Sequence, residues 1–385
     1  MLTKIRLSIA KTATKKYVNG FIFVFTMWLL SRLIIITAMH LIAPTIVPEA
    51  VQSDPKFVLE GGWERFVGWD GSWYHKIAAL GYEYEDDFQK HSVAFFPFYP
   101  VIVRSLMSLG IPFAVAATVV NNSAFLGALL ILYNWVQEWQ TLNTARWATA
   151  VLAWCPFSLF GTVTYTEGLF LLLSTAALQA FDQKQYIKAG ILGALTTATR
   201  ITGVPLIPTF LLVAWKERRS ALAYGAGIAA SAGLLIFMLY CAIRFGEPVA
   251  FLRAQRGWQA YNGTGWSSWL NLFTQELTLG KGLSTGFFAV TKIFMFFGGG
   301  YILWRMRSQL PRVAVVYGFC SLAMLFSSGS VVNSVNRYAY GIVSLSLALG
   351  VLLSRYPRWG YATMGIFALV SVYFSIRFSW GLWVA

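Results

Sequence analysis

The stretch VNGFIFVFTMWLLSRLIIITAMHLI (18–42) decides the fold class. It holds a single charged side chain, Arg32, and it is long enough to cross a bilayer as one helix. Apolar runs recur along the rest of the chain, and we place further spans at 113–137, 147–163, 166–181, 189–214, 221–243, 284–304, 313–331, 339–354 and 360–378. The sequence therefore predicts an all-α polytopic membrane protein with about 11 transmembrane helices.

The composition supports a membrane location for the whole chain. The 385 residues are 57% hydrophobic and only 12% charged, and the mean hydropathy is +0.60. Soluble domains typically carry about 25% charged residues. The longest polar segment (43–93) is too small and too aromatic to form an independent globule. We therefore expect a single transmembrane domain over 1–385, with residues 43–110 as its first outer loop.

The distribution of charge predicts the orientation. The net charge is +15. With the N-terminus inside, the inner segments are 1–17, 138–146, 182–188, 216–219, 305–312 and 355–358. These segments hold 16 Lys or Arg residues against 3 Asp or Glu residues, whereas the outer segments hold nearly equal numbers of basic and acidic residues. Basic residues concentrate on the cytoplasmic side of membrane proteins. The excess of positive charge is thus explained by anchoring, and a nucleic-acid partner is not expected.

The segment 189–214 does not fit a single straight helix. It contains Arg200, Gly203, Pro205 and Pro208 near its middle, and both of its flanks are basic. One crossing cannot place both flanks on the same side of the membrane. We therefore favour two short, tilted helices that meet near Arg200, a geometry that is tolerated where it lines a protein cavity.

The first outer loop carries the main candidate for chemistry. The motif WDGSWYHKIAALGY (69–82) places one carboxylate, Asp70, among tryptophans and glycines, and AFFPFYP (94–100) follows it. A charge at a membrane surface is costly unless it has a function. Two interpretations stay open: Asp70 is a catalytic group, or it caps a helix that begins near Gly71.

The same loop shows an apolar pattern. Trp63, Phe66, Trp73, Ile77 and Leu80 recur at spacings of three and four residues, which predicts a helix lying in the membrane interface. Gly68 and Gly71 offer an alternative, a break that presents Asp70 on a turn. The segment 94–110 is short for a span, and we expect a second interfacial helix there.

Three further groups of polar residues fall on the outer side. TYTEGLF (164–170) brings Tyr165 and Glu167, PVAFLRAQRGWQAY (248–261) brings Gln255, Arg256 and Trp258, and NSVNRYAY (333–340) brings Arg337 and Tyr338. Each group also has a structural interpretation: a favourable acid at a helix N-terminus, an interfacial helix, and an arginine that reaches the lipid headgroups. Because acid, guanidinium and amide groups converge on one side, we expect a shared site.

The quoted motifs resemble the PIG-V-type family, which includes the second mannosyltransferase of glycosylphosphatidylinositol assembly and its prokaryotic relatives. The matching pieces are WDGSWYHKIAALGY, AFFPFYP, YTEGLF, ATRITG (198–203) and PVAFLRAQRGW, with NRYAY as a weaker match. The resemblance implies a C-type membrane glycosyltransferase whose catalytic acid is Asp70. It implies a polyprenyl-phosphate sugar as donor, with mannose as the favoured sugar, and transfer on the external or lumenal face. The short loops suggest a prokaryotic relative in a bacterial inner membrane.

The chemistry of transfer agrees with these residues. A sugar hydroxyl needs a base to take its proton, and one carboxylate suffices because the lipid phosphate leaves as a stable anion. Guanidinium groups bind phosphate through paired hydrogen bonds, so Arg337, Arg200 and Arg256 are candidates for the donor phosphate. Direct displacement inverts the anomeric centre. We expect the remaining substrate contacts from Trp69, Trp73, Tyr74, Tyr165, Glu167, Gln255, Trp258 and Tyr338.

The expected partners are the polyprenyl-phosphate sugar, a lipid- or glycan-linked acceptor, and membrane lipids. No cofactor and no metal are expected. The three cysteines and three histidines are far apart in the sequence, and Gly71 stands where many C-type enzymes have a second acid. The alternative class is a transporter or lipid flippase without transferase activity, because buried charges and broken helices also mark transport paths.

Overall fold

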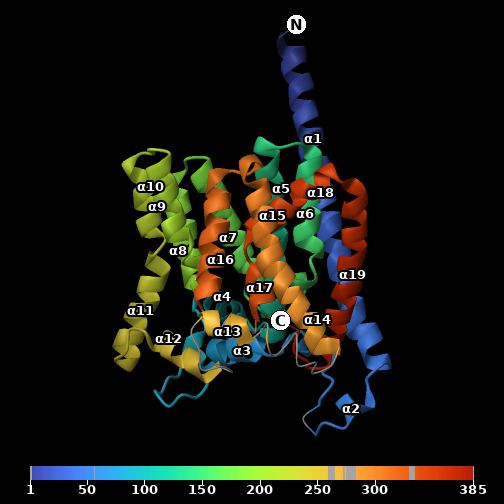
Figure 1. The fold of residues 1–385 in the computed structure, drawn as a ribbon, viewed down its shortest axis with the longest axis vertical. Coiled ribbons are helices and arrows are strands. Elements are labelled where there is room, and N and C mark those ends of the chain that lie inside the picture. The colour runs from blue at the N-terminus through green and yellow to red at the C-terminus, as the bar shows by residue number, and fades with distance from the viewer. Residues whose placement is uncertain are drawn as a thin grey trace.

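The computed structural model describes residues 2–55, 57–258, 265–271, 274, 283–328 and 334–384. Within these ranges all regular structure is helical. The helices stand side by side in one bundle, and α1 (Leu2–Thr37) projects beyond one end of it while the C-terminus lies toward the other (Figure 1). The fold is therefore the all-α membrane bundle that the sequence predicts.

Five segments are long and apolar enough to cross a membrane, judged by length and composition: Val18–Thr45, Phe113–Trp139, Ala221–Phe245, Gly286–Gln309 and Pro357–Ser379. The bundle is completed by shorter or broken helices. The helices of the bundle after α1 are α5 Phe113–Trp139, α6 Leu142–Trp154, α7 Glu167–Asp182, α8 Tyr186–Thr199, α9 Leu206–Lys216, α10 Ala221–Ala229, α11 Ala232–Phe245, α14 Leu283–Ile293, α15 Gly299–Met306, α16 Arg312–Ser327, α18 Val343–Arg355 and α19 Pro357–Ser379.

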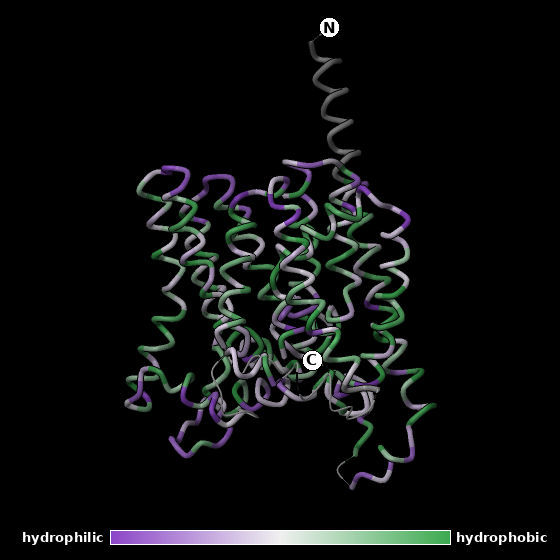
Figure 2. The backbone as a smooth tube through the Cα atoms, viewed as in Figure 1, coloured by the Kyte–Doolittle hydropathy of each residue, from purple (hydrophilic) through white to green (hydrophobic). Residues whose placement is uncertain are grey.

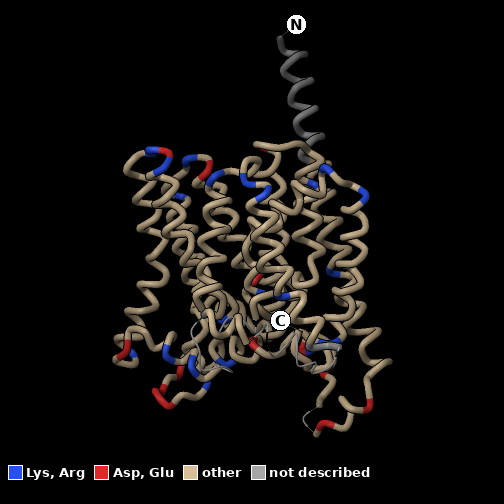
Figure 3. The backbone as a smooth tube through the Cα atoms, in the orientation of Figure 1, with Lys and Arg blue, Asp and Glu red and all other residues tan. Residues whose placement is uncertain are grey.

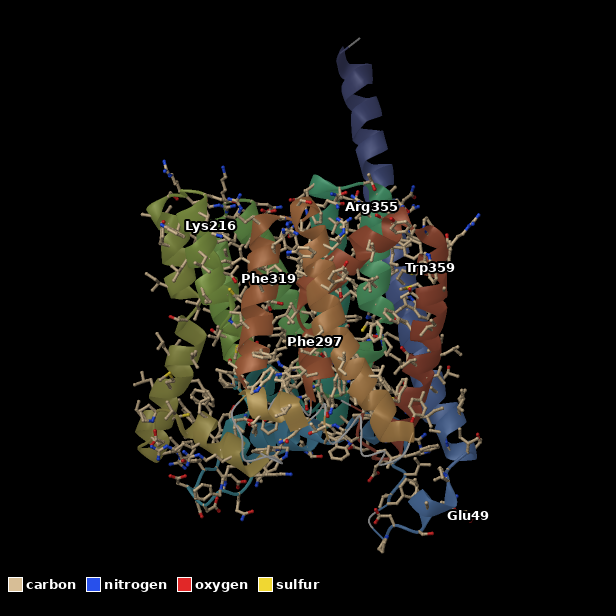
Figure 4. The ribbon with its side chains drawn as sticks, in the orientation of Figure 1. Glu49, Lys216, Phe297, Phe319, Arg355 and Trp359 are labelled. Atoms are coloured by element: carbon tan, nitrogen blue, oxygen red, sulfur yellow. The ribbon has the colours of Figure 1, made fainter. Side chains whose placement is uncertain are left out.

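The two ends of the bundle differ in polarity. The middle of the bundle is mainly apolar, and polar residues gather at its ends (Figure 2). Lysine and arginine dominate the end nearest the N-terminus, whereas the opposite end carries both signs of charge (Figure 3). Lys216 and Arg355 lie at the first end and Glu49 at the second (Figure 4). This division agrees with the charge asymmetry in the sequence.

The segment 189–214 forms two half-helices. Helix α8 ends at Thr199, a 3₁₀ turn follows at Ile201–Gly203, and α9 returns toward the end from which α8 came (Figure 1). Arg219, just after α9, donates a hydrogen bond to the carbonyl of Phe181 at 2.5 Å, so the chain before α8 and the chain after α9 meet at one end. Arg200 therefore lies at the tip of a hairpin, as expected.

Residues 43–110, the expected first outer loop, contain separate short helices. They are α2 (Glu49–Gln52), a 3₁₀ turn at Gly62–Phe66, α3 (Asp70–Leu80), a 3₁₀ turn at Ser92–Ala94 and α4 (Phe98–Met107). The prediction of one helical stripe from Trp63 to Leu80 is wrong, because the chain breaks between Phe66 and Asp70. Trp63 is 49% exposed and Leu80 81% exposed, while Ile77 is buried. The alternative of a break is correct at Gly68, which lies between the 3₁₀ turn and α3, but Gly71 lies within α3 and Asp70 is the first residue of that helix. Helix α4 is the short second helix that was expected, and it packs against α3 and α5.

Candidate active site

The turn before α3 sets the position of Asp70. Trp69 has φ of 52°, a conformation that non-glycine residues adopt at a cost. A Cβ atom on Gly68 would lie 3.3 Å from the ring of Phe378. On the other side, the indole of Trp69 meets that of Trp383 edge to face, with centroids 5.0 Å apart. The end of α19 and the following residues thus hold the turn in place.

The carboxylate of Asp70 pairs with a guanidinium. Asp70 Oδ2 lies 2.6 Å from Nη1 of Arg337, and the backbone N–H of Asp70 donates to the hydroxyl of Tyr165 at 3.3 Å. The residue preceding α3 is Trp69, and no side chain caps the helix. The interpretation of Asp70 as a helix cap is therefore wrong, because its carboxylate faces the ion pair instead.

Glu167 joins two guanidinium groups. Glu167 is the first residue of α7, and its side chain is 1% exposed. Arg200 donates to Glu167 Oε1, and also to the hydroxyl of Thr166 at 3.0 Å. Nε of Arg337 lies 3.3 Å from the same Oε1. The hairpin tip, the start of α7, the start of α3 and the short helix α17 (Val335–Tyr340) thereby converge on one network.

Arg337 is buried rather than located at the surface. Only 5% of the residue is exposed, so the interpretation as a headgroup-seeking arginine on an outer turn is wrong. The ring of Tyr338 lies 5.2 Å from the guanidinium carbon of Arg337 and 5.2 Å from that of Arg200. Two carboxylates and two guanidinium groups balance in charge, and their interactions are strengthened because little water reaches them.

Gly71 is required by close packing. A Cβ atom at this position would lie 2.2 Å from Oγ1 of Thr164, a separation that no side chain can adopt. A second acid next to Asp70 does not fit here. Within the described residues, no three His, Cys, Asp or Glu side chains are grouped so that they could hold a metal ion.

An aromatic cluster lies on the next turn of α3. The indole of Trp73 stacks on Phe95, with centroids 6.0 Å apart, and meets Trp258 at 5.5 Å. Phe95 also contacts Tyr74 at 5.2 Å, and the hydroxyl of Tyr74 lies 3.4 Å from that of Thr166. Tyr74 therefore links the aromatic cluster to the charged network. Burial raises the pKa of the Tyr74 hydroxyl, against the opposing effect of Arg200, so Tyr74 stays neutral.

Gln255 and Arg256 have contacts along the loop that follows α3. Gln255 donates to the carbonyl of Ala94 at 3.3 Å, and the guanidinium of Arg256 lies 5.5 Å from the ring centroid of Phe88. These contacts join α12 (Ala250–Ala254) and the turn after it to residues 88–95. The structure therefore brings Asp70, Tyr165, Glu167, Arg200, Arg337 and Tyr338 together, whereas these contacts of Gln255 and Arg256 are with residues 88–95 and not with this network.

Several supporting residues were missed by the sequence analysis. Asn121 of α5 donates to the carbonyls of Phe160 and Val163 at 2.8 and 2.7 Å, and it accepts from the backbone N–H of Gly168 at 2.7 Å. It thereby fixes the segment that carries Tyr165 and Glu167. An amide inside an apolar span is a signal that could have identified it. Thr164, Thr166 and Trp383 show no comparable signal.

Comparisons with known proteins identify the family of the chain. A family model described as Mannosyltransferase (PIG-V) matches residues 13–254. GPI mannosyltransferase 2 of Drosophila pseudoobscura pseudoobscura is 30% identical over 142 residues, which cover 34% of this chain and 30% of the fly protein.

Solved structures resemble the chain in fold. ArnT from Cupriavidus metallidurans bound to undecaprenyl phosphate superposes with a TM-score of 0.55 at 13% identity, over 92% of this chain and 63% of that protein. Its apo state gives a TM-score of 0.53 at 14% identity, over 92% and 63% of the two chains. The chain therefore spans less than two thirds of ArnT and shares its C-type fold. Because the family model covers well over half of the sequence, the chain belongs to the PIG-V mannosyltransferase family.

Proposed function

We propose that the protein is a membrane mannosyltransferase that uses a polyprenyl-phosphate mannose donor and an acceptor hydroxyl on a lipid or a glycan. The observation that carries the proposal is the Asp70–Arg337 pair, with 2.6 Å between Oδ2 and Nη1, in a chain of the PIG-V family. It combines the base and the phosphate ligand that this reaction needs. We place the site in the periplasmic half of a bacterial inner membrane.

In the proposed reaction, Asp70 is the general base. The acceptor oxygen attacks the anomeric carbon while Asp70 takes its proton, and the bond from that carbon to the phosphate oxygen breaks. The polyprenyl phosphate leaves with the bonding electrons, so the anomeric configuration inverts. The proton then passes from Asp70 to water. Asp70 is 17% exposed on its side chain, more than Arg337 at 6%, so it is the more accessible member of the pair.

Arg337 has two roles in this scheme. Without the donor it neutralises Asp70, and with the donor it binds the phosphate. A phosphate that draws Arg337 away leaves Asp70 as a freer base, so donor binding prepares the acceptor site. Glu167 keeps both Arg337 and Arg200 oriented, since each lies against its Oε1 atom. We propose further that Trp73 and Trp258 contact the acceptor, because aromatic faces suit the apolar faces of sugars.

A transfer assay tests the proposal. Purified protein in nanodiscs is given polyprenyl-phosphate mannose, with polyprenyl-phosphate glucose as the matched donor, and a membrane lipid extract as acceptor. We expect release of polyprenyl phosphate and mannose-labelled lipid from the first donor. Absence of release from both donors, with a folded protein, would remove the glycosyltransferase proposal and leave the transporter or flippase.

The orientation has its own test. Single cysteines at Ser72, on α3, and at Gln183, at the basic end, are treated with an impermeant thiol reagent on intact cells. We expect Ser72→Cys to react and Gln183→Cys to react only after permeabilisation, because basic loops stay inside. Labelling of Gln183→Cys from outside would place the Asp70 site in the cytoplasm.

A further inference from the structure

A groove lies at the basic end of the bundle, opposite the site of Asp70. It has a volume of about 580 Å³ and is lined by the turn before α8, the start of α8 and Leu222 of α10. Pockets of about 300–1,000 Å³ are typical of small-molecule sites. Its volume is therefore sufficient for a ligand larger than a single ion.

The lining of the groove combines two chemistries. Ile187, Ile191 and Leu222 are 72%, 58% and 62% exposed, so they face outward from the bundle. Lys184 and Lys188 line the same groove. A ligand that matches the whole surface must carry an anionic group beside long apolar chains.

Acidic groups at this end are engaged by other residues. Asp182 accepts from the indole N–H of Trp135 at 3.0 Å, and Glu217 pairs with Arg219 at 2.7 Å and with Arg312 at 3.4 Å. Among the described residues, neither lysine of the groove takes part in an ion pair like these. The mouth of the groove is therefore positively charged.

The backbone at Lys184 is an unusual place for a lysine. Its φ is 60°, and its N–H donates to the carbonyl of Phe181 at 3.1 Å while the next N–H reaches Ala180 at 2.8 Å. This turn closes α7, and glycine is the common residue in the left-handed position of such turns. A lysine there costs free energy that glycine would not.

We propose that this groove binds an anionic phospholipid of the surrounding bilayer. The lipid phosphate lies between Lys184 and Lys188, and an acyl chain follows Ile187, Ile191 and Leu222. Basic pockets between helices on the cytoplasmic side of a membrane, where the proposed orientation places this end of the bundle, suit anionic headgroups. Residues of the first turn of α8 line the groove, and the side chain of the preceding residue does not cap this helix, so the free N–H groups of the turn are available as hydrogen-bond donors for the phosphate.

The test measures retention of phosphatidylglycerol. The full-length protein is purified in detergent, titrated with phosphatidylglycerol or phosphatidylcholine, and examined by native mass spectrometry and thermal unfolding. We expect one tightly held phosphatidylglycerol and a rise in Tm that phosphatidylcholine does not produce. The double variant Lys184→Gln/Lys188→Gln should bind about 30-fold more weakly, at roughly fivefold for each lysine.

Two controls make the result decisive. Arg305→Gln/Arg358→Gln removes two exposed charges from other helices at the same end and should leave the binding unchanged. Lys184→Gly relieves the left-handed backbone, so the Tm without lipid should stay the same or rise, while the lipid-induced rise should become smaller.

Three outcomes would overturn the proposal. They are equal binding by wild type and the lysine double variant, equal loss in the arginine control, and a Tm rise of the same size with inorganic phosphate alone. The last outcome would mean that the groove binds a free anion and not a lipid.

Discussion

Two regions of the molecule bury guanidinium groups, and they do so with different partners. Arg32 of α1 is 2% exposed. Among the described residues it donates to neutral oxygens alone, namely the carbonyl and hydroxyl of Ser158 at 3.0 and 2.9 Å and the carbonyl of Ala153 at 3.5 Å. Arg337 is 5% exposed and faces two carboxylates. Similar burial thus occurs in two chemically distinct settings.

The different partners indicate a structural role for Arg32 and a chemical role for Arg337. Helix α6 ends at Trp154, before Pro156, and its last carbonyls need donors. Arg32 donates to one of them, the carbonyl of Ala153, and more closely to Ser158 in the turn that follows α6. Its positive charge also lies at a helix C-terminus, where it is favourable, so its burial needs no transport function. Arg337 instead pairs with Asp70. This ion pair can be broken when a phosphate binds Arg337 or when Asp70 takes up a proton. The partners of a buried arginine, and not its burial, distinguish the two roles.

The largest expected effect is at the carboxylate of the second region. Asp70→Asn keeps the shape of the side chain and removes the base, so turnover should fall about 10²-fold or more. The amide oxygen can still accept from Arg337, but the buried guanidinium loses one of its two charged partners, so the Tm should fall moderately while the protein stays folded. The measurement is the initial rate of mannose transfer together with thermal unfolding.

Asp86→Asn is the matched control for this variant. Asp86 pairs with Arg253 at 3.1 Å, but both side chains are at least 40% exposed, and exposed pairs contribute little. Its rate should stay near that of wild type. Normal turnover in Asp70→Asn would exclude Asp70 as the base.

The sequence was sufficient to predict much of this region. The motif around Asp70, the kink at Arg200 and the acid at Glu167 were each identified as polar groups in or beside apolar segments, where polarity is costly. The sequence could not predict the pairing of Asp70 with Arg337, because 267 residues separate them in the chain and only the tertiary fold brings them together.

Other errors have physical causes as well. The periodic stripe from Trp63 to Leu80 suggested one helix because spacing alone does not report backbone strain at Trp69. The interpretation of Arg337 as a surface residue followed from its place in a short polar segment, although the helix that carries it is buried in the bundle. The role of Trp383 depends on the packing of a distant segment, which leaves no local pattern.

The second prediction concerns Arg337. Arg337→Lys keeps the charge and loses the planar fork that binds phosphate, so kcat/KM for the donor should fall about tenfold. Arg337→Ala leaves Asp70 and Glu167 without this partner, so it should also lower the free energy of unfolding by about 3–5 kcal/mol. Transfer rates across donor concentrations measure the first effect, and denaturant unfolding measures the second.

Arg337→Lys is the informative variant because its fold is better preserved. A surface arginine would accept lysine without loss. Full activity in the lysine variant, with little loss in Arg337→Ala, would leave Arg200 as the phosphate ligand and would weaken the contrast between the two buried regions.

The third prediction tests the first region. Arg32→Met removes the donors to Ser158 and Ala153, and unpaired buried carbonyls cost about 1–3 kcal/mol. We expect a loss of stability of that order, while the rate per folded molecule stays within about twofold because no reacting group is touched.

Arg104→Met, at an exposed position on α4, is the control and should change neither quantity. A selective loss of rate in Arg32→Met, with unchanged Tm, would mean that this arginine also takes part in catalysis.

The smallest expected effect lies at the edge of the catalytic region. The indole of Trp383 packs against Trp69 with centroids 5.0 Å apart, and Trp69 has the strained φ of 52° that precedes Asp70. An aromatic pair of this kind contributes about 0.5–1.5 kcal/mol, so Trp383→Ala should lower kcat about twofold to tenfold with little change in KM, because it loosens the turn without touching the substrate. Trp383→Phe should restore most of the rate. Trp359→Ala, on α19 but 71% exposed, should behave as wild type. If Trp383→Ala lowers Tm and leaves kcat per folded molecule unchanged, Trp383 stabilises the bundle as Arg32 does and does not position the Asp70 turn.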